Sequence, residues 1–134
     1  MDLDRWYVLE PDHTIRVIDN MDELSEYYAL GIDARRVGLE RVGRYEVSTV
    51  FLVHNHRHFG DGPPIVFETM IFDTEAPDHD WKSIAAGEVS TSDGGRWLDL
   101  WCDRYCTWDE AKAGHDRVIA ELRAGKTPDE IEAS

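Results

Sequence analysis

Three histidines in a loop between two apolar runs are the residues most suited to metal chemistry. They lie in "VSTVFLVHNHRHFGDGPPIVFETMIF", residues 47–72. His54, His56 and His58 occupy every second position, so an extended chain places all three on one side. Three imidazoles could hold Zn²⁺ with an open fourth position for hydrolysis. Two steps of about 6.6 Å along a strand, however, separate the first histidine from the third by roughly 13 Å. The spacing therefore favours a polar loop, with a metal site as the alternative.

A single carboxylate interrupts the second apolar run. Glu68 in "IVFETMIF" shares its expected strand face with Val66, Met70 and Phe72. Burying an unpaired carboxylate is costly, so we expect either a pocket at this face or a basic partner. One interpretation is a core glutamate that bridges two elements; the other is a ligand-orienting carboxylate or a general base. The basic partners that we expect for this carboxylate are Arg44, Arg57, His54 and His115.

Acidic residues dominate the chain. The sequence has 28 Asp and Glu against 14 Lys and Arg, for a net charge of −14. A field of this sign repels phosphate backbones, so we expect no direct binding of nucleic acid. Residues 33–60 depart from this pattern, because five arginines there face only three acidic residues. A small anionic ligand could be drawn to that segment, unless its arginines pair with surface acids.

The remaining reactive side chains are better explained by structure than by catalysis. His115 lies on the apolar stripe of an expected helix, directly after Gly114. A histidine on such a face is more often a satisfied structural residue; the alternative is a site member opposite Glu68. Cys102 and Cys106 are spaced too widely for a local disulfide if the chain is extended, so we expect free thiols. No pattern in the sequence indicates a cofactor, and we expect none.

Two long apolar runs predict the central strands of a sheet. In Tyr45 to His54 and in Ile65 to Phe72, apolar residues point to both sides, so we expect both strands to be covered on both faces. The eleven residues that join the runs, 54–64, exceed the two to five of an ordinary hairpin loop. Loops of this length are often functional, so we place the rim of any site here.

Capping signals predict the helices. Thr107 and Glu110 form a capping box before an amphipathic stretch that ends at Gly125, while Asn20 and Gly31 bracket a shorter helical spacing. Further strands are predicted over 6–10, 14–19, 35–42 and 96–105. Because strands and helices are largely segregated, the expected class is α+β. We expect an antiparallel sheet with the C-terminal helix packed on it and a short helix near the N-terminus.

One domain is expected over 1–125, followed by a flexible tail at 126–134. Residues 73–95 are polar, with Trp81 as an apolar anchor, and are expected to be irregular. The sequence has no apolar run of about 18 residues and no signal-peptide pattern, so we expect no membrane span and a cytoplasmic location. One helix leaves a second sheet face to be covered by another element or subunit, which suggests a homo-oligomer.

Two motifs resemble a family of small uncharacterised proteins from tailed phages, prophages and their bacterial hosts. They are the 47–72 segment quoted above and "RYCTWDEAKAGHDRVI", residues 104–119, while "DARRVGLERVGRYE" is similar to the family's approach to the first motif. The resemblance covers roughly 33–72 and 104–119. It implies a phage-type origin, and in a phage-infected cell a location in the host cytoplasm. It assigns no catalytic residues.

Three functions are compatible with these observations. The first is a non-enzymatic phage-type accessory protein that sequesters a small anionic or nucleotide-derived host signal, which small phage proteins of this kind often do. Its ligand would be held by Glu68, Arg44, His54, Arg57 and His115. The second is a metal-dependent hydrolase that uses His54, His56, His58 and Glu68. The third is an acidic decoy that binds a host protein through charge alone.

Overall fold

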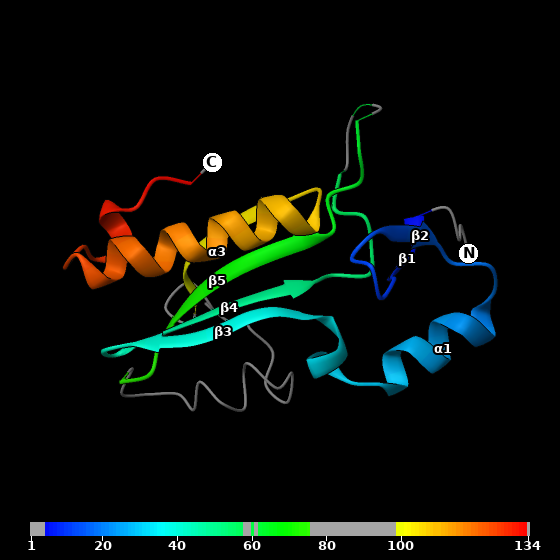
Figure 1. Ribbon diagram of the computed structural model, residues 1–134, viewed down its shortest axis with the longest axis horizontal. Coiled ribbons are helices and arrows are strands. Elements are labelled where there is room, and N and C mark those ends of the chain that lie inside the picture. The colour runs from blue at the N-terminus through cyan, green and yellow to red at the C-terminus, as the bar shows by residue number, and fades with distance from the viewer. Residues whose placement is uncertain (1–4, 58–59, 61, 76–98, 134) are drawn as a thin grey trace.

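A four-stranded antiparallel sheet forms the centre of the molecule (Figure 1). The structure, a computed structural model, describes residues 5–57, 60, 62–75 and 99–133. The strands follow in the order of the chain: β3 (Arg36–Val42), β4 (Tyr45–Phe51), β5 (Phe67–Asp73) and β6 (Asp99–Tyr105). The predicted α+β class is confirmed. The predictions for Trp81 and for most of the irregular 73–95 segment lie outside the described residues.

A long helix covers one face of this sheet (Figure 1). Helix α3 (Trp108–Arg123) has Thr107 as its N-cap. The Thr107 hydroxyl accepts from the Glu110 N–H, and the Glu110 carboxylate accepts from the Thr107 N–H, which together form the predicted capping box. The sequence predicts an apolar stripe of Trp108, Ala111, His115, Val118, Ile119 and Leu122. All of these are buried except Trp108, which is half-buried, and Gly114 is buried in addition. A Cβ at Gly114 would overlap the Tyr105 hydroxyl, so the absence of a side chain allows β6 to approach the helix closely.

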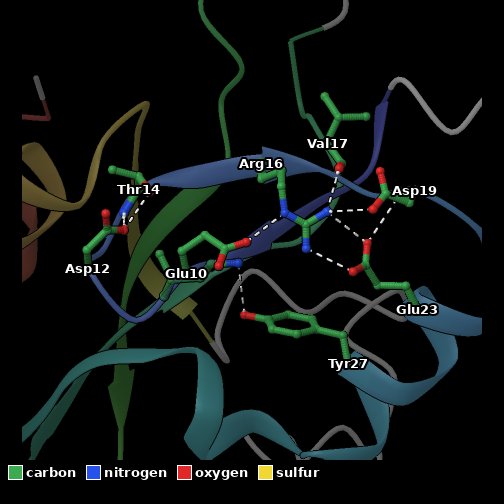
Figure 2. Close-up of polar contacts among 9 residues, drawn as sticks. Glu10, Asp12, Thr14, Arg16, Val17, Asp19, Glu23 and Tyr27 are labelled. Carbon is green, nitrogen blue, oxygen red and sulfur yellow. Dashed lines mark hydrogen bonds and ion pairs between the residues drawn. The ribbon is translucent and has the colours of Figure 1, made fainter.

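A small hairpin and a short helix close one end of the sheet. Strands β1 (Tyr7–Leu9) and β2 (Ile15–Val17) pair with each other, and α1 (Met21–Ala29) follows with Asn20 as its N-cap. Figure 2 shows how Arg16 joins the two, with bonds of 2.7 Å to Glu10 and 2.8 Å to Glu23. The guanidinium lowers the pKa of Glu23 to about 2, so this link is charged on both sides over most of the pH range.

Two apolar clusters stabilise the described part of the molecule. One joins the hairpin and α1 to the ends of β4 and β5, through Phe51, Phe67 and their neighbours. The other lies beneath the C-terminal half of α3 and includes Val47, Ile71 and Trp101. No helix among the described residues is long and apolar enough to cross a membrane.

The C-terminal segment packs on the second cluster, in contrast to the frayed tail that the sequence suggests. A short helical turn, η4 (Pro128–Glu130), turns the chain back, and Ile131 is 4% exposed among the residues of this cluster. The indole Nε1 of Trp101 donates a 2.9 Å bond to the Ile131 carbonyl. Burial of one isoleucine and satisfaction of one indole donor together account for the docking.

Candidate anion-binding site

Glu68 has a basic partner, but it is none of the four expected ones. Arg104, directly opposite on β6, donates from Nε at 2.8 Å to the Glu68 carboxylate, and the Cys102 thiol donates to the same oxygen at 3.2 Å. Glu68 is 8% exposed, whereas the Arg104 side chain is 47% exposed. The carboxylate on β5 is therefore a cross-strand partner of an arginine on β6, consistent with the interpretation that it bridges two elements.

His115 is fully buried between α3 and the sheet. Its Nε2 lies 3.1 Å from the Glu40 carboxylate and its Nδ1 lies 2.7 Å from the Thr49 hydroxyl, which in turn contacts the Thr69 hydroxyl at 2.6 Å. Since an ionised carboxylate only accepts, Nε2 carries the proton and Nδ1 accepts from Thr49. Glu68 immediately precedes Thr69 on β5, so its side chain points to the opposite face of the sheet and does not face His115.

Arg44 also lies away from these groups. It forms a two-pronged pair with Asp73, at 2.9 and 2.6 Å, beside the turn between β3 and β4. This guanidinium lowers the pKa of Asp73 and is itself held charged by the pair. Arg44 is thus an arginine paired with a surface acid, which is the simpler of the two interpretations of the 33–60 segment.

The long loop leaves β4 through a strained turn and extends beyond the sheet beside β1 and β2 (Figure 1). Val53 is fully buried and has a φ of 71°, which is rare for a β-branched residue. A 2.8 Å bond from the His54 N–H to the Leu52 carbonyl closes a γ-turn around it. Such a conformation costs about 1–3 kcal/mol, and strained backbone of this kind is concentrated at functional sites. It brings His54 alongside Trp6, with ring centroids 4.6 Å apart.

Asn55 fixes the course of the loop after this turn. Its side-chain oxygen accepts from the backbone N–H groups of Arg57, at 2.8 Å, and Ile65, at 2.9 Å, and so ties the two arms of the loop together. The Arg5 guanidinium reaches the same point and donates to the carbonyls of Asn55, at 2.8 Å, and Arg57, at 3.1 Å. Two arginines from distant parts of the sequence therefore meet at this loop.

The two arginines differ from most others in the chain because neither has an acidic partner in the described part of the structure. Arg5 donates to backbone carbonyls, and Arg57 donates from Nε to the Pro63 carbonyl at 2.8 Å. The arginines with a carboxylate oxygen between 2.6 and 3.7 Å are Arg16, Arg36, Arg44, Arg104, Arg117 and Arg123. In a chain of net charge −14, two arginines at one loop without a carboxylate partner form a local anion-attracting surface.

We call the group formed by Arg5, Trp6, His54, His56 and Arg57 the loop cluster. His54 and His56 are neighbours within it, with ring centroids 5.8 Å apart. It thus contains two of the predicted site residues, His54 and Arg57, and excludes Glu68, Arg44 and His115. A Cβ at Gly62 would lie 2.5 Å from the Arg57 guanidinium carbon, so this glycine makes room for the side chain.

The structure describes only two of the three histidines that were predicted to hold a metal at this loop. Two imidazoles at this separation are compatible with a shared ion, but the third predicted ligand, His58, lies outside the described residues. Over residues 5–57, 60, 62–75 and 99–133, no group of three or more histidine, cysteine or acidic side chains has the geometry to hold a metal.

A cavity of about 370 Å³ between β6 and α3 is the main competitor for an anion. It is lined by Arg104 and Arg117 with Glu110. Each of these arginines already pairs with an acid, Glu68 and Glu121 respectively. Glu110 occupies the helix N-terminus, which would otherwise attract an anion. The loop cluster is therefore the stronger candidate.

Sequence reasoning missed Arg5 and Trp6, because they reach the loop through long-range pairing. Trp6 forms an antiparallel bridge with His54, and the Tyr7 N–H donates to the Val53 carbonyl at 2.8 Å. The feature that could have indicated this contact is the pair of strands predicted over 6–19. The backbone N–H and C=O groups on the outer side of the first strand need hydrogen-bond partners from another segment. Comparison with known proteins adds no assignment, since no family model, curated protein or solved structure matches this chain.

Proposed function

We propose that this protein is a non-enzymatic, phage-type accessory protein that binds a small anionic, nucleotide-derived ligand at the loop cluster. The observation that carries the proposal is the pair Arg5 and Arg57, two arginines that meet at the Arg57 carbonyl and have no carboxylate partner in the described part of a strongly acidic chain. Guanidinium groups bind phosphate through paired N–H donors, and Trp6 offers an aromatic surface beside them. We infer that the ligand is sequestered and that the active form is a homo-oligomer.

Binding is favoured over catalysis by the state of the two candidate bases. Glu68 is engaged by Arg104 and Cys102, and His115 is enclosed by Thr49 and Glu40 beneath α3. A general base must come within about 3 Å of the proton that it removes. A fully buried imidazole offers a substrate no such approach.

A thermal-shift titration tests the proposal, with inorganic pyrophosphate, AMP and cyclic nucleotides as probes. A ligand at 100 times its Kd should stabilise the protein by about 2.7 kcal/mol. Arg57→Gln removes one cation and should weaken binding about tenfold or more, since a charge-assisted bond contributes about 1.5–3 kcal/mol. Arg41→Gln is the matched control, because Arg41 also donates from Nε to a backbone carbonyl, that of Gly43 at 3.0 Å.

The two variants make the result decisive. Binding that Arg57→Gln weakens and Arg41→Gln leaves unchanged supports the loop cluster. If no anionic probe shifts the melting temperature, or if both variants reduce binding equally, the proposal is wrong.

A metal-dependent hydrolase is the second candidate, favoured by the closeness of the His54 and His56 rings. This alternative requires stoichiometric Zn, Mn or Fe in protein purified without a histidine tag. Elemental analysis of the wild type and of His56→Ala separates it from the first proposal. Metal that is present in the wild type and lost in the variant would support the hydrolase.

A further inference from the structure

A cavity of about 510 Å³ lies where the tip of the first hairpin meets the end of the long loop and the start of α3. Its lining includes Asp12, His13, Pro63, Pro64, Trp108 and Asp109. This volume is within the range of 300–1,000 Å³ that is typical of small-molecule sites. Two rings from distant parts of the chain meet at it, because the imidazole of His13 stacks on the indole of Trp108 at 3.7 Å with an interplanar angle of 10°.

Trp108 offers a fixed aromatic surface. Its ring packs at 85° against Phe67, with centroids 6.5 Å apart, and contributes to the core cluster of the hairpin and sheet. Within the described part of the chain, its indole N–H has no hydrogen-bond partner, whereas the indole of Trp101 does. One side of Trp108 is thus anchored in the core, and the ring can still donate a bond to a ligand.

His13, in contrast, is an exposed residue at the tip of a turn. Figure 2 shows the Asp12 carboxylate accepting from the N–H and hydroxyl of Thr14, at 3.1 and 2.6 Å, across the position of His13. The His13 backbone has a φ of 73°, in the left-handed region that favours glycine. The side chain therefore rests on Trp108 from a strained, solvent-exposed position, and its displacement uncovers the outer face of the Trp108 ring.

We propose that this cavity binds a planar heteroaromatic ring, which takes the place of His13 on the Trp108 indole. The imidazole is a flat nitrogen heterocycle, and its parallel stacking shows what kind of group the surface accepts. Asp12 and Asp109 flank the cavity, so the ring is one with N–H or amino donors. A purine base has these properties.

This site lies next to the loop cluster. The Pro63 carbonyl accepts from Arg57 Nε at 2.8 Å, and Pro63 itself lines the cavity. A ligand with an anionic group and a base can thus contact both sites. The inference rests on the proposed function for the anionic half of the ligand, but the ring site itself can be tested separately.

Calorimetric titration with AMP, adenosine and ribose 5-phosphate measures the two halves independently. We expect AMP to bind most tightly, adenosine to bind through its base alone, and ribose 5-phosphate through its phosphate alone. His13→Ala removes the competing ring and should tighten AMP and adenosine binding by roughly twofold to tenfold, the contribution of one aromatic stack. Trp108→Leu should weaken both by a similar factor, Trp108→Phe should retain most of the affinity, and ribose 5-phosphate should respond to none of the three.

The outcomes separate the two proposals. Adenosine binding that responds to His13 and Trp108, without any gain from the phosphate in AMP, supports the ring site and overturns the anionic site. Equal affinity for AMP and ribose 5-phosphate overturns the ring site, as does unchanged AMP and adenosine binding in both His13→Ala and Trp108→Leu. Far-UV circular dichroism and melting temperature establish that Trp108→Leu is folded; if it is not, the His13→Ala and Trp108→Phe results decide.

Discussion

At the scale of single residues, His115 shows how a reactive side chain serves the fold. The hydrogen bonds run in one direction, from Thr69 to Thr49, to His115 and to Glu40, so each of these four side chains has a partner. Gly38 belongs to the same arrangement, because a Cβ there would lie 2.6 Å from His115 Nε2. The structural role of His115 could be inferred from its place on an apolar stripe, but its partners could not, because Glu40 and Thr49 come from two other strands.

Because His115 is buried, its contribution to the stability of the fold depends on pH. It lowers the pKa of His115 below its ordinary value of 6.5, although Glu40 partly opposes the shift. The unfolded chain then takes up this proton more readily than the folded protein. The free energy of unfolding should therefore fall as the pH drops below 6.5, and the loss should level off below the folded-state pKa.

The variant His115→Gln removes this titration. We expect it to lose roughly 1–3 kcal/mol at pH 7 and to show a smaller decrease between pH 7 and pH 5 than the wild type, measured by urea unfolding. His13→Gln, at an exposed histidine, is the control. If the free energy of unfolding of His115→Gln falls between pH 7 and pH 5 as steeply as that of the wild type, this role is contradicted.

At the scale of elements, most of the secondary structure could be predicted and most of the pairing could not. The capping box of Thr107 and Glu110 and the apolar stripe of α3 are local patterns, and the helix follows them. Glu68 could be recognised as needing a partner. Its pairing with Arg104 depends on the register between β5 and β6, which includes a shift at Ile71, and no local pattern encodes that register.

The pair between Glu68 and Arg104 should contribute little to stability, because the arginine is half exposed to solvent. A double-mutant cycle with Glu68→Ala and Arg104→Ala should give a coupling of about 0.5–1 kcal/mol. Glu68→Gln should leave binding of anionic probes unchanged. A loss of binding in Glu68→Gln comparable with that of Arg57→Gln would show that Glu68 belongs to the ligand site.

The C-terminal turn was missed because one buried isoleucine in nine residues has no periodicity. Ile131→Ala should lower the free energy of unfolding by about 2 kcal/mol, since it empties a place beside Trp101 in the second cluster. Glu132→Ala, at the exposed neighbour, is the control. Equal stability of the two variants, measured by chemical unfolding, would show that the segment contributes nothing.

At the scale of the whole molecule, charge is distributed unevenly in a way that composition only partly reveals. The net charge of −14 opposes contact with nucleic acid, yet the fold brings Arg5 and Arg57 together without an acid beside either in the described part of the chain. The arginine-rich segment 33–60 contains Arg57, which is one of the two cations of the loop cluster. Arg44, however, turned out to pair with Asp73, and the second cation of the loop cluster came from the N-terminal segment.

The acidic-decoy alternative makes a different prediction at this scale. A decoy acts through its overall charge, so single arginine substitutions should not reduce its activity. The loop cluster, in contrast, requires a local site whose occupancy depends on Arg57.

The most direct test of the central claim is an amide NMR titration of the wild-type protein with AMP, repeated with Arg57→Gln. We predict that the largest shift changes fall on residues 5–6 and 54–57, and that they are strongly reduced in the variant and retained in Arg41→Gln. Shift changes concentrated at Arg104 and Arg117, or an absence of shift changes at millimolar AMP, would contradict the assignment of the anion-binding site to the loop cluster.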